Sequence, residues 1–308
     1  MMAHEIVTLG EAMVVLYPGE SVSLDQATTV TLGIGGAESN LAILLSRLGH
    51  GVRFISRVGN DPFGQRIRAT LQNEAVDITH VQIDGAAPTG IFFREWLSDG
   101  KRRVFYYRSG SAASRLASTD LQPEMFSGTR LLHISGITPA LSRSCAATVE
   151  CAIELAHAAG ALVSFDPNYR PTLWDPVTAS RTLMPLMARV DILLMGHEDS
   201  QAILGVADEE EALRKSSELG ARIVVLKQGE RGATALVGTT RITVPAEIVT
   251  AAIDPVGAGD AFNAGFLSGW LRGYTPEQAL RLGAHLGAAT VSVAGDYIPR
   301  DYQIQLPG

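Results

Sequence analysis

The sequence predicts an α/β protein built on a doubly wound, mostly parallel sheet with a small β-sheet lid. Two observations lead to this prediction. Short runs rich in valine, isoleucine and leucine alternate with helical patterns along most of the 308 residues, as they do where helices cover both faces of a sheet. Two stretches, 12–35 and 87–108, interrupt that rhythm with short alternating segments typical of antiparallel strands. We expect one domain over residues 1–308, with these two stretches as its lid.

The individual elements are expected in the following order. The apolar runs predict strands at 5–10, 52–57, 130–135, 161–166, 190–195 and 222–227. Helical periodicity predicts helices at 37–48, 62–75, 142–159, 176–188, 197–204, 209–219, 259–272 and 276–293. The first helix follows a glycine pair and ends before Gly49, a residue type that commonly terminates helices. Alternating segments predict lid strands at 89–96 and 103–108, and an antiparallel strand at 233–237.

Composition and charge exclude several classes of protein. Hydrophobic residues make up 46% of the chain and charged residues 19%, which is enough for a large core. No apolar run approaches the ~20 residues of a membrane-spanning helix. The net charge of −7 argues against a nucleic-acid partner. The N-terminus enters a strand pattern without a basic and apolar leader, so we expect a cytoplasmic protein.

Cysteine and histidine give no sign of a metal cage or a disulfide framework. Cys145 and Cys151 stand six residues apart, which is neither a zinc spacing nor a redox pair. The seven histidines are scattered along the chain. We therefore expect both cysteines to be reduced packing residues, and no metal site built from protein ligands alone.

The most informative segment, residues 254–266, reads Asp-Pro-Val-Gly-Ala-Gly-Asp-Ala-Phe-Asn-Ala-Gly-Phe. Gly257, Ala258 and Gly259 stand at the start of an apolar helix, where unpaired N–H groups and the helix dipole attract phosphate. The phosphate would repel a neighbouring carboxylate, so Asp260 needs a role there. That role is to orient and deprotonate a hydroxyl that attacks phosphorus. The alternative is that Asp260 only caps the helix.

Other polar residues predict how a substrate is held. Gly36 permits close approach of a ligand, and Asn40 offers a donor and an acceptor to a polyol, although a plain strand-to-helix turn explains both. Arg108 closes a lid strand, and Tyr106 lies on the same face of it. An arginine fork suits a carboxylate, and a solvated lid charge is the alternative. Arg170 precedes a proline at a strand end, where its positive charge is suited to bind the substrate or the ATP phosphates. The alternative is that Arg170 forms a structural salt bridge.

Two further segments follow strands of the main sheet. The first segment comprises Lys227, Gln228, Gly229, Glu230, Arg231 and Gly232. A simple hairpin is a strong explanation for it, while its glycines let the backbone approach a flat nucleotide, a use favoured mainly by the other polar segments. Asp199 is suited to hold Mg²⁺ through water. As a lone feature it is more typical of a charge that complements a helix N-terminus.

With these segments assembled, the chain resembles the ribokinase-like (PfkB-type) carbohydrate kinases from end to end. Within them it is most similar to the 2-keto-3-deoxygluconate kinases. Residues 254–265 match the family's C-terminal signature, and Gly35, Gly36, Asn40, Gly49 and Gly59 match the N-terminal one. The resemblance implies a β lid that often forms a dimer contact. It also implies ATP and Mg²⁺, and leaves a monovalent cation near the anion hole possible.

The resemblance also implies a role for each matching residue. Asp260 is the base, and Gly257, Ala258 and Gly259 hold the charge on the transferring phosphoryl group. The implied substrate, 2-keto-3-deoxygluconate, would be phosphorylated at its 6-hydroxyl and bound by Gly36, Asn40, Tyr106, Arg108, Arg170, Asp260 and Asp296. ATP would lie over residues 227–232, with Asn168, Tyr169 and Arg170 near its phosphates.

The sequence departs from the family pattern at one point. Gly196 and Asp199 replace the Asn and Glu of the family's usual Asn-x-x-Glu. This replacement puts the affinity for Mg²⁺ in question, but not the type of reaction. Fructokinase or another ribokinase-like sugar kinase is the alternative function, and a catalytically weak sensor is a third. Two arginines favour an acid substrate, since a neutral ketose needs no cation.

Overall fold

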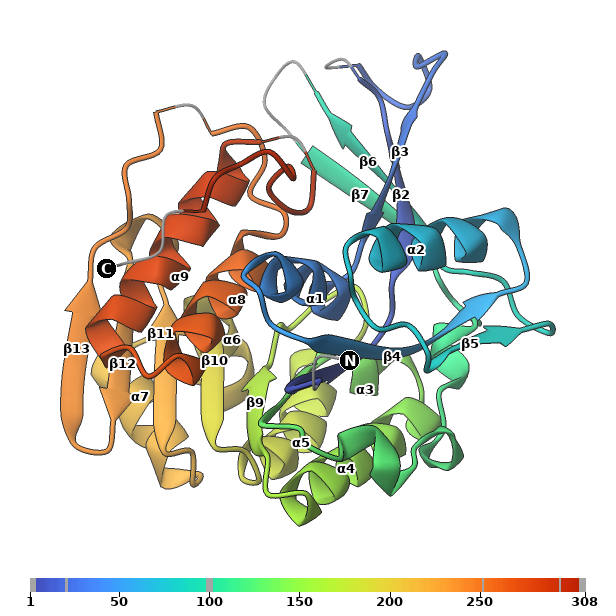
Figure 1. The fold of residues 1–308 in the computed structure, drawn as a ribbon. Coiled ribbons are helices and arrows are strands. Elements are labelled where there is room, and N and C mark those ends of the chain that lie inside the picture. Colours follow the sequence, from blue (N-terminus) through green and yellow to red (C-terminus); the bar gives the residue numbers. More distant parts are fainter. Residues whose placement is uncertain (1–3, 20–21, 98–101, 251, 294, 305–308) are drawn as a thin grey trace.

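The computed structural model describes residues 4–19, 22–97, 102–250, 252–293 and 295–304. Within them the main sheet has nine strands, in the order β13 (Thr240–Val244), β12 (Ala233–Val237), β11 (Ile223–Lys227), β10 (Ile192–Gly196), β9 (Leu162–Asp166), β8 (Leu131–Ser135), β1 (Ile6–Leu9), β4 (Val52–Gly59) and β5 (Val81–Asp84). The strands from β11 to β5 are parallel, while β12 and β13 extend one edge antiparallel. Helices lie on both faces of this sheet (Figure 1), so the predicted doubly wound architecture is confirmed.

Each helix is named by its bounds: α1 (Ala37–Arg47), α2 (Pro62–Asn73), α3 (Ile137–Leu141), α4 (Arg143–Ala158), α5 (Pro176–Met187), α6 (His197–Leu204), α7 (Glu209–Glu218), α8 (Ala258–Leu271) and α9 (Pro276–Val291). Several begin at a residue whose side chain accepts from the first-turn amides, such as Asp61 before α2 and Ser142 before α4. The predicted helices and strands are confirmed at nearly the expected residues. The sequence did not predict β5, β13 or α3.

The strands alternate between two cores, one on each face of the sheet. In β10, Ile192 and Leu194 face the core shared with α1, α8 and α9, while Leu193 and Met195 face the core beneath α4 and α5. This two-sided burial explains why the strands read as continuous apolar runs. No helix in the described ranges is long and apolar enough to cross a membrane.

A second sheet forms the lid, with the strand order β3 (Thr31–Gly35), β2 (Met13–Tyr17), β6 (Ile91–Trp96) and β7 (Arg102–Tyr107). β2 pairs antiparallel with β3 and parallel with β6, and β6 pairs antiparallel with β7. The sheet projects beyond α1 and α2 at one end of the molecule (Figure 1). Its outer face carries exposed aromatic side chains, among them Phe105 and Tyr107.

Candidate active site

The polar segments singled out above meet at the carboxyl-terminal edge of the main sheet. β9 ends at Asp166, β10 at Gly196 and β11 at Lys227. Asn263, one turn into α8, contacts both Asp166 and Lys227. Ligands of open α/β sheets bind at this edge, so the site lies where the topology predicts.

The N-terminus of α8 leaves backbone donors available to an anion. Its N-cap, Gly257, has a φ of 80°, a left-handed conformation that favours glycine. A Cβ atom at this position would lie 1.9 Å from the carbonyl oxygen of Asp296. Within the described ranges, the N–H groups of Gly257, Gly259 and Asp260 meet no acceptor, whereas that of Ala258 donates to a carbonyl of the preceding turn at 3.2 Å. The helix tip therefore offers several unpaired amides to a ligand.

Asp260 lies in the first turn of α8 and faces α1. Its Oδ2 accepts a hydrogen bond from Asn40 Nδ2 at 2.8 Å. Asp260 is half-buried, and burial of its carboxyl among protein atoms raises the pKa to about 7. The Asn40 hydrogen bond and the positive charge of Arg170 lower this pKa and offset part of the effect. A carboxylate with a pKa near neutrality is suited to accept a proton from a hydroxyl.

Lys227, Asp166 and Asn263 form a polar cluster next to Asp260. Lys227 Nζ donates to Asp166 Oδ2 at 2.6 Å and to Asn263 Oδ1 at 3.1 Å, and Asn263 Nδ2 donates to the same Asp166 oxygen at 2.6 Å. The positive charge of Lys227 also lowers the pKa of Asp260. From the sequence, Lys227 was expected to contact the nucleotide, and the other two members were not predicted. Their signal was present, because Asp166 opens a polar segment at a strand end and Asn263 lies in the 254–266 motif.

Asp199 fixes the turn that follows β9. Its Oδ1 accepts from the N–H of Tyr169 and its Oδ2 from that of Gly196, each at 2.8 Å. Burial and the nearby negative charge of Asp166 together raise the pKa of this carboxyl to about 6. Asp199 lies in the first turn of α6, the position of a charge that complements a helix N-terminus, which was the alternative reading from the sequence. No group of three or more acidic, histidine or cysteine side chains suited to a metal occurs in the part of the chain described.

Residues 227–232 form the hairpin between β11 and β12. Gln228 Nε2 donates to Glu209 Oε2 at 2.7 Å, which holds the hairpin to α7. Gly232 has a φ of 100°, and a Cβ there would lie 2.1 Å from the carbonyl oxygen of Val244. The hairpin expected from the sequence is therefore present, and it requires glycine at this position. The intervening Glu230 and Arg231 are exposed.

The predicted substrate-binding residues of the lid side meet at Glu11. Arg108 Nε donates to Glu11 Oε2 at 2.7 Å, and its guanidinium lies 5.6 Å from the ring centre of Tyr106. Gly36, with a φ of 150°, packs so closely that a Cβ would lie 2.2 Å from the Glu11 carbonyl oxygen. Glu11 is buried and was not predicted. Arg170 stands apart from this group, with an exposed side chain on the turn after β9.

A buried arginine, Arg94, links the lid to the anion-binding turn. Arg94 Nη1 lies 2.9 Å from Asp254 Oδ2 and 2.8 Å from Asp296 Oδ1. Of these three residues, only Asp296 was predicted from the sequence to belong to the site. The signal for Arg94 was an arginine in the middle of the apolar strand Ile91–Trp96.

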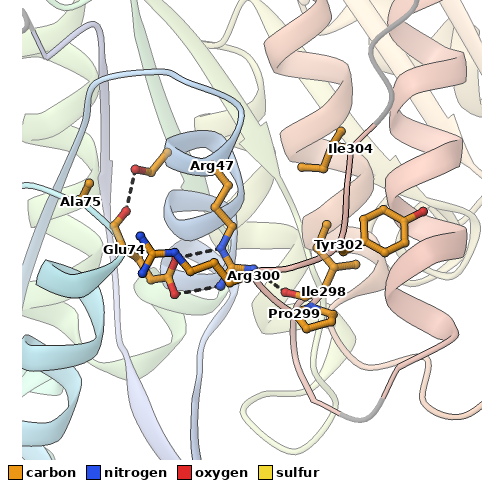
Figure 2. A pocket seen from close by; sticks show the side chains of 9 residues that line it. Arg47, Glu74, Ala75, Ile298, Pro299, Arg300, Tyr302 and Ile304 are labelled. Atoms are coloured by element: carbon orange, nitrogen blue, oxygen red, sulfur yellow. Dashed lines mark hydrogen bonds and ion pairs between the residues drawn. The ribbon is translucent and has the colours of Figure 1, made fainter.

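One cavity lies elsewhere, at the C-terminal end of α1 (Figure 2). It has a volume of about 380 Å³ and is lined by Ser46, Arg47, Glu74, Ala75, Ile298, Pro299, Arg300, Tyr302 and Ile304. Arg47 and Glu74 form a two-pronged ion pair across it, with both N–O distances at 2.8 Å. None of the predicted site residues lines this cavity, so it does not coincide with the site around Asp260.

Comparisons with known proteins show the family of the chain. The model of the pfkB family carbohydrate kinases matches residues 3–302. A 2-dehydro-3-deoxygluconokinase of Bacillus subtilis is 35% identical over 297 residues, covering 96% of this chain and 92% of that protein. One of Thermoproteus tenax is 37% identical over 295 residues, covering 94% and 89%.

Solved structures are similar over nearly the whole chain. A 2-dehydro-3-deoxygluconokinase of Thermotoga maritima has a TM-score of 0.85 and 28% identity, covering 95% of each chain. An E. coli protein described as Ribokinase II, in complex with ATP and Mg²⁺, has a TM-score of 0.88 and 25% identity, covering 95% of this chain and 94% of that one. A fructokinase double mutant of Vibrio cholerae, bound to fructose, ADP and potassium, has a TM-score of 0.84 and 28% identity, covering 96% and 94%. The chain therefore belongs to the PfkB family of carbohydrate kinases, phosphotransferases with an alcohol acceptor.

Proposed function

We propose that the protein phosphorylates 2-keto-3-deoxygluconate at its 6-hydroxyl with ATP, using Asp260 as general base and the helix tip at residues 257–259 as anion hole. The observation that supports this most is the position of Asp260. Its carboxyl, with a pKa of about 7, stands in the first turn of a helix whose leading amides lack acceptors. The names of the Bacillus and Thermoproteus relatives support the choice of sugar acid.

In this proposal the proton and the phosphoryl group move in one balanced step. Asp260 accepts the proton of the hydroxyl while that oxygen forms a bond to the γ-phosphorus of ATP, and the bond from this phosphorus to the ADP oxygen breaks. The unpaired amides of the helix tip donate to the oxygens of the phosphoryl group, which carry the charge. The lid excludes water, which would otherwise compete with the sugar hydroxyl for the phosphoryl group.

We assign the nucleotide to the turn after β9 and the hairpin after β11. The turn comprises Asn168, Tyr169 and Arg170, and the hairpin comprises residues 227–232. Mg²⁺ would neutralise charge on the ATP phosphates. The buried oxygens of Asp166 and Asp199 are ligands of the type that Mg²⁺ prefers. Among the described residues each Asp199 oxygen has one hydrogen-bond donor, so the residues fit an ion held through water.

The choice of an acid substrate rests on Arg108 and Arg170. Glu11 engages Arg108 through Oε2, and within the described residues the guanidinium Nη1 donors have no acceptor. Arg170 is exposed, and its charge acts on Asp260. A hydrogen bond to a charged group contributes ~1.5–3 kcal/mol, so each arginine would favour an acid over a neutral ketose roughly ten- to a hundredfold.

We also propose that the protein dimerises through the outer face of the lid. Phe105 is 41% exposed and Tyr107 is 65% exposed, and both stand on β7, the edge strand of that sheet. An exposed aromatic face on an edge strand is suited to pair with a second copy.

The experiment that tests the proposed function is an ADP-release assay with 2-keto-3-deoxygluconate and with fructose. We expect the sugar acid to be the better substrate by at least roughly tenfold in kcat/KM. Asp260→Asn should keep nucleotide binding and lower kcat by at least ~10²-fold. Near-normal turnover by this variant would place the base elsewhere.

Arginine variants test the substrate class separately from the reaction. Arg170→Leu should reduce kcat/KM for the sugar acid more than for fructose, and its side chain is exposed, so the fold should tolerate the change. Arg115→Leu is the control, because Arg115 is also largely exposed but pairs with Asp84 outside the site. A wild-type preference for fructose that Arg108→Ala leaves intact would favour the fructokinase alternative.

A further inference from the structure

Arg94 is a fully buried cation where the lid meets the anion-binding turn. Its side chain is 1% exposed, and its guanidinium lies 5.2 Å from the ring centre of Tyr17 and 5.0 Å from that of Trp96. Both rings belong to the lid. Cation–π contacts and two carboxylates therefore hold one charge in a fixed place.

The two carboxylates that Arg94 contacts are part of the framework of the anion hole. Asp254 Oδ1 accepts from the N–H of Val256, the residue immediately before Gly257. The carbonyl oxygen of Asp296 fills the space where a Gly257 side chain would stand. Both acids are almost completely buried, at 0% and 4% exposed. Two buried negative charges behind an anion hole would oppose binding of a phosphoryl group unless a cation balanced them.

A monovalent cation is one way to supply that positive charge, and the resemblance to the family left it possible. The fructokinase of Vibrio cholerae was solved with potassium bound. The described residues here do not fit such an ion between Asp254 and Asp296, because the carboxylate oxygens that would hold it already contact Arg94 Nη1 at 2.9 and 2.8 Å.

We infer that Arg94 is a built-in cation that replaces a monovalent ion behind the anion hole, so that phosphoryl transfer by this protein does not depend on potassium. Arg94 acts as a positioning residue. It offsets one of the two negative charges of Asp254 and Asp296 and thereby reduces their repulsion of the phosphate. Since Arg94 belongs to β6, the balancing charge is also part of the lid. This inference rests on the proposed kinase reaction but not on which sugar is phosphorylated.

The first test is a potassium titration of the wild-type protein at constant ionic strength, with tetramethylammonium chloride as the balancing salt. The readouts are kcat with whichever sugar is turned over, and the unfolding temperature without substrate. We expect kcat to change by less than about twofold, because Arg94 already supplies the positive charge. A tenfold change would correspond to about 1.4 kcal/mol. The unfolding temperature should also not depend on potassium. A wild-type kcat that requires potassium would overturn the inference.

The second test is the variant Arg94→Met, which keeps the bulk of the side chain and removes its charge. We expect kcat to fall by roughly ten- to a hundredfold in tetramethylammonium and to recover at least severalfold with potassium or ammonium. Potassium should now raise the unfolding temperature, because an ion that binds only the folded state stabilises it. A loss that neither ion restores would mean that Arg94 has a purely structural role.

A matched control and a conservative variant complete the design. Arg57 also lies between two carboxylates, 3.3 Å from Asp84 and 2.6 Å from Asp120, but outside the site. Arg57→Met should therefore lose stability without gaining any response to potassium. If Arg94→Met does not fold, Arg94→Lys decides, since it retains a charge and should keep potassium-independent turnover. A potassium requirement in Arg94→Lys would refute the inference. If no sugar is phosphorylated at all, the proposed function fails, while the unfolding temperatures still report on the cation.

Discussion

The hydrogen bond from Asn40 to Asp260 allows a quantitative prediction about pH. Asp260 must be deprotonated to act as a base, and its pKa of about 7 means that activity falls as the pH drops below neutrality. The Asn40 Nδ2 donor, 2.8 Å from Oδ2, stabilises the charged form. The variant Asn40→Ala removes this donor, so the pKa of Asp260 should rise further and the acidic limb should move to higher pH.

The size of the shift follows from the geometry. A hydrogen bond to a charged group contributes ~1.5–3 kcal/mol, and one pKa unit corresponds to about 1.4 kcal/mol. Removal of the donor without replacement would therefore raise the pKa of Asp260 by about one to two units. Alanine leaves room for a water molecule to replace part of the lost bond, so we expect a shift of about one unit.

The assay is the pH profile of kcat/KM, because this parameter reports the ionisation of the free enzyme. In Asn40→Ala the midpoint of the acidic limb should move upward by about one unit, whatever the change in substrate binding. The control is Ser46→Ala, at the other end of α1, where the hydroxyl donates to a carbonyl far from the base. An unchanged midpoint in Asn40→Ala, or an equal shift in the control, would refute the assignment of the limb to Asp260.

Two further predictions concern the anion-binding turn and acid stability. Gly257→Ala should lower kcat by at least roughly tenfold, because its Cβ would lie 1.9 Å from the Asp296 carbonyl oxygen. The control is Gly160→Ala, where the φ is a similar 76° but no atom lies within 4 Å of the added Cβ. This control should lose only about 1–2 kcal/mol of stability and keep its kcat. Burial raises the pKa of Asp77, but hydrogen bonds and the charge of Arg53 lower it to about 2, against an ordinary 3.8. The charged form therefore stabilises the fold above pH 3.8, by about 1–2 kcal/mol after allowance for solvent screening, and this is lost as the pH falls toward 2. Denaturant unfolding of wild type and Asp77→Asn should show a difference at pH 7 that shrinks at the acid end, and a constant difference would contradict this account.

Much of the fold could be predicted because its elements have strong local signals. β10 and β11 are continuous apolar runs, and helices such as α4 and α9 have clear periodicity and caps. β5 was missed because it has only four residues, of which the middle two are exposed, so it shows neither an apolar run nor a regular alternation. α3 was missed because it is a single short turn of five residues.

The sequence by itself determined the alternation of strands and helices, the glycine-rich turn before α8 and the acid that follows it. These depend on neighbouring residues, whose conformations are set by backbone sterics and local hydrogen bonds. Only the tertiary structure decided which partners those residues meet. Asn40 is 220 positions from Asp260, Arg108 is 97 from Glu11, and Arg94 is 202 from Asp296. Contacts over such separations leave no pattern in the chain, because the folding of the sheet and lid brings them together. The same burial that joins them raises the pKa of Asp260 and requires a cation beside Asp254 and Asp296.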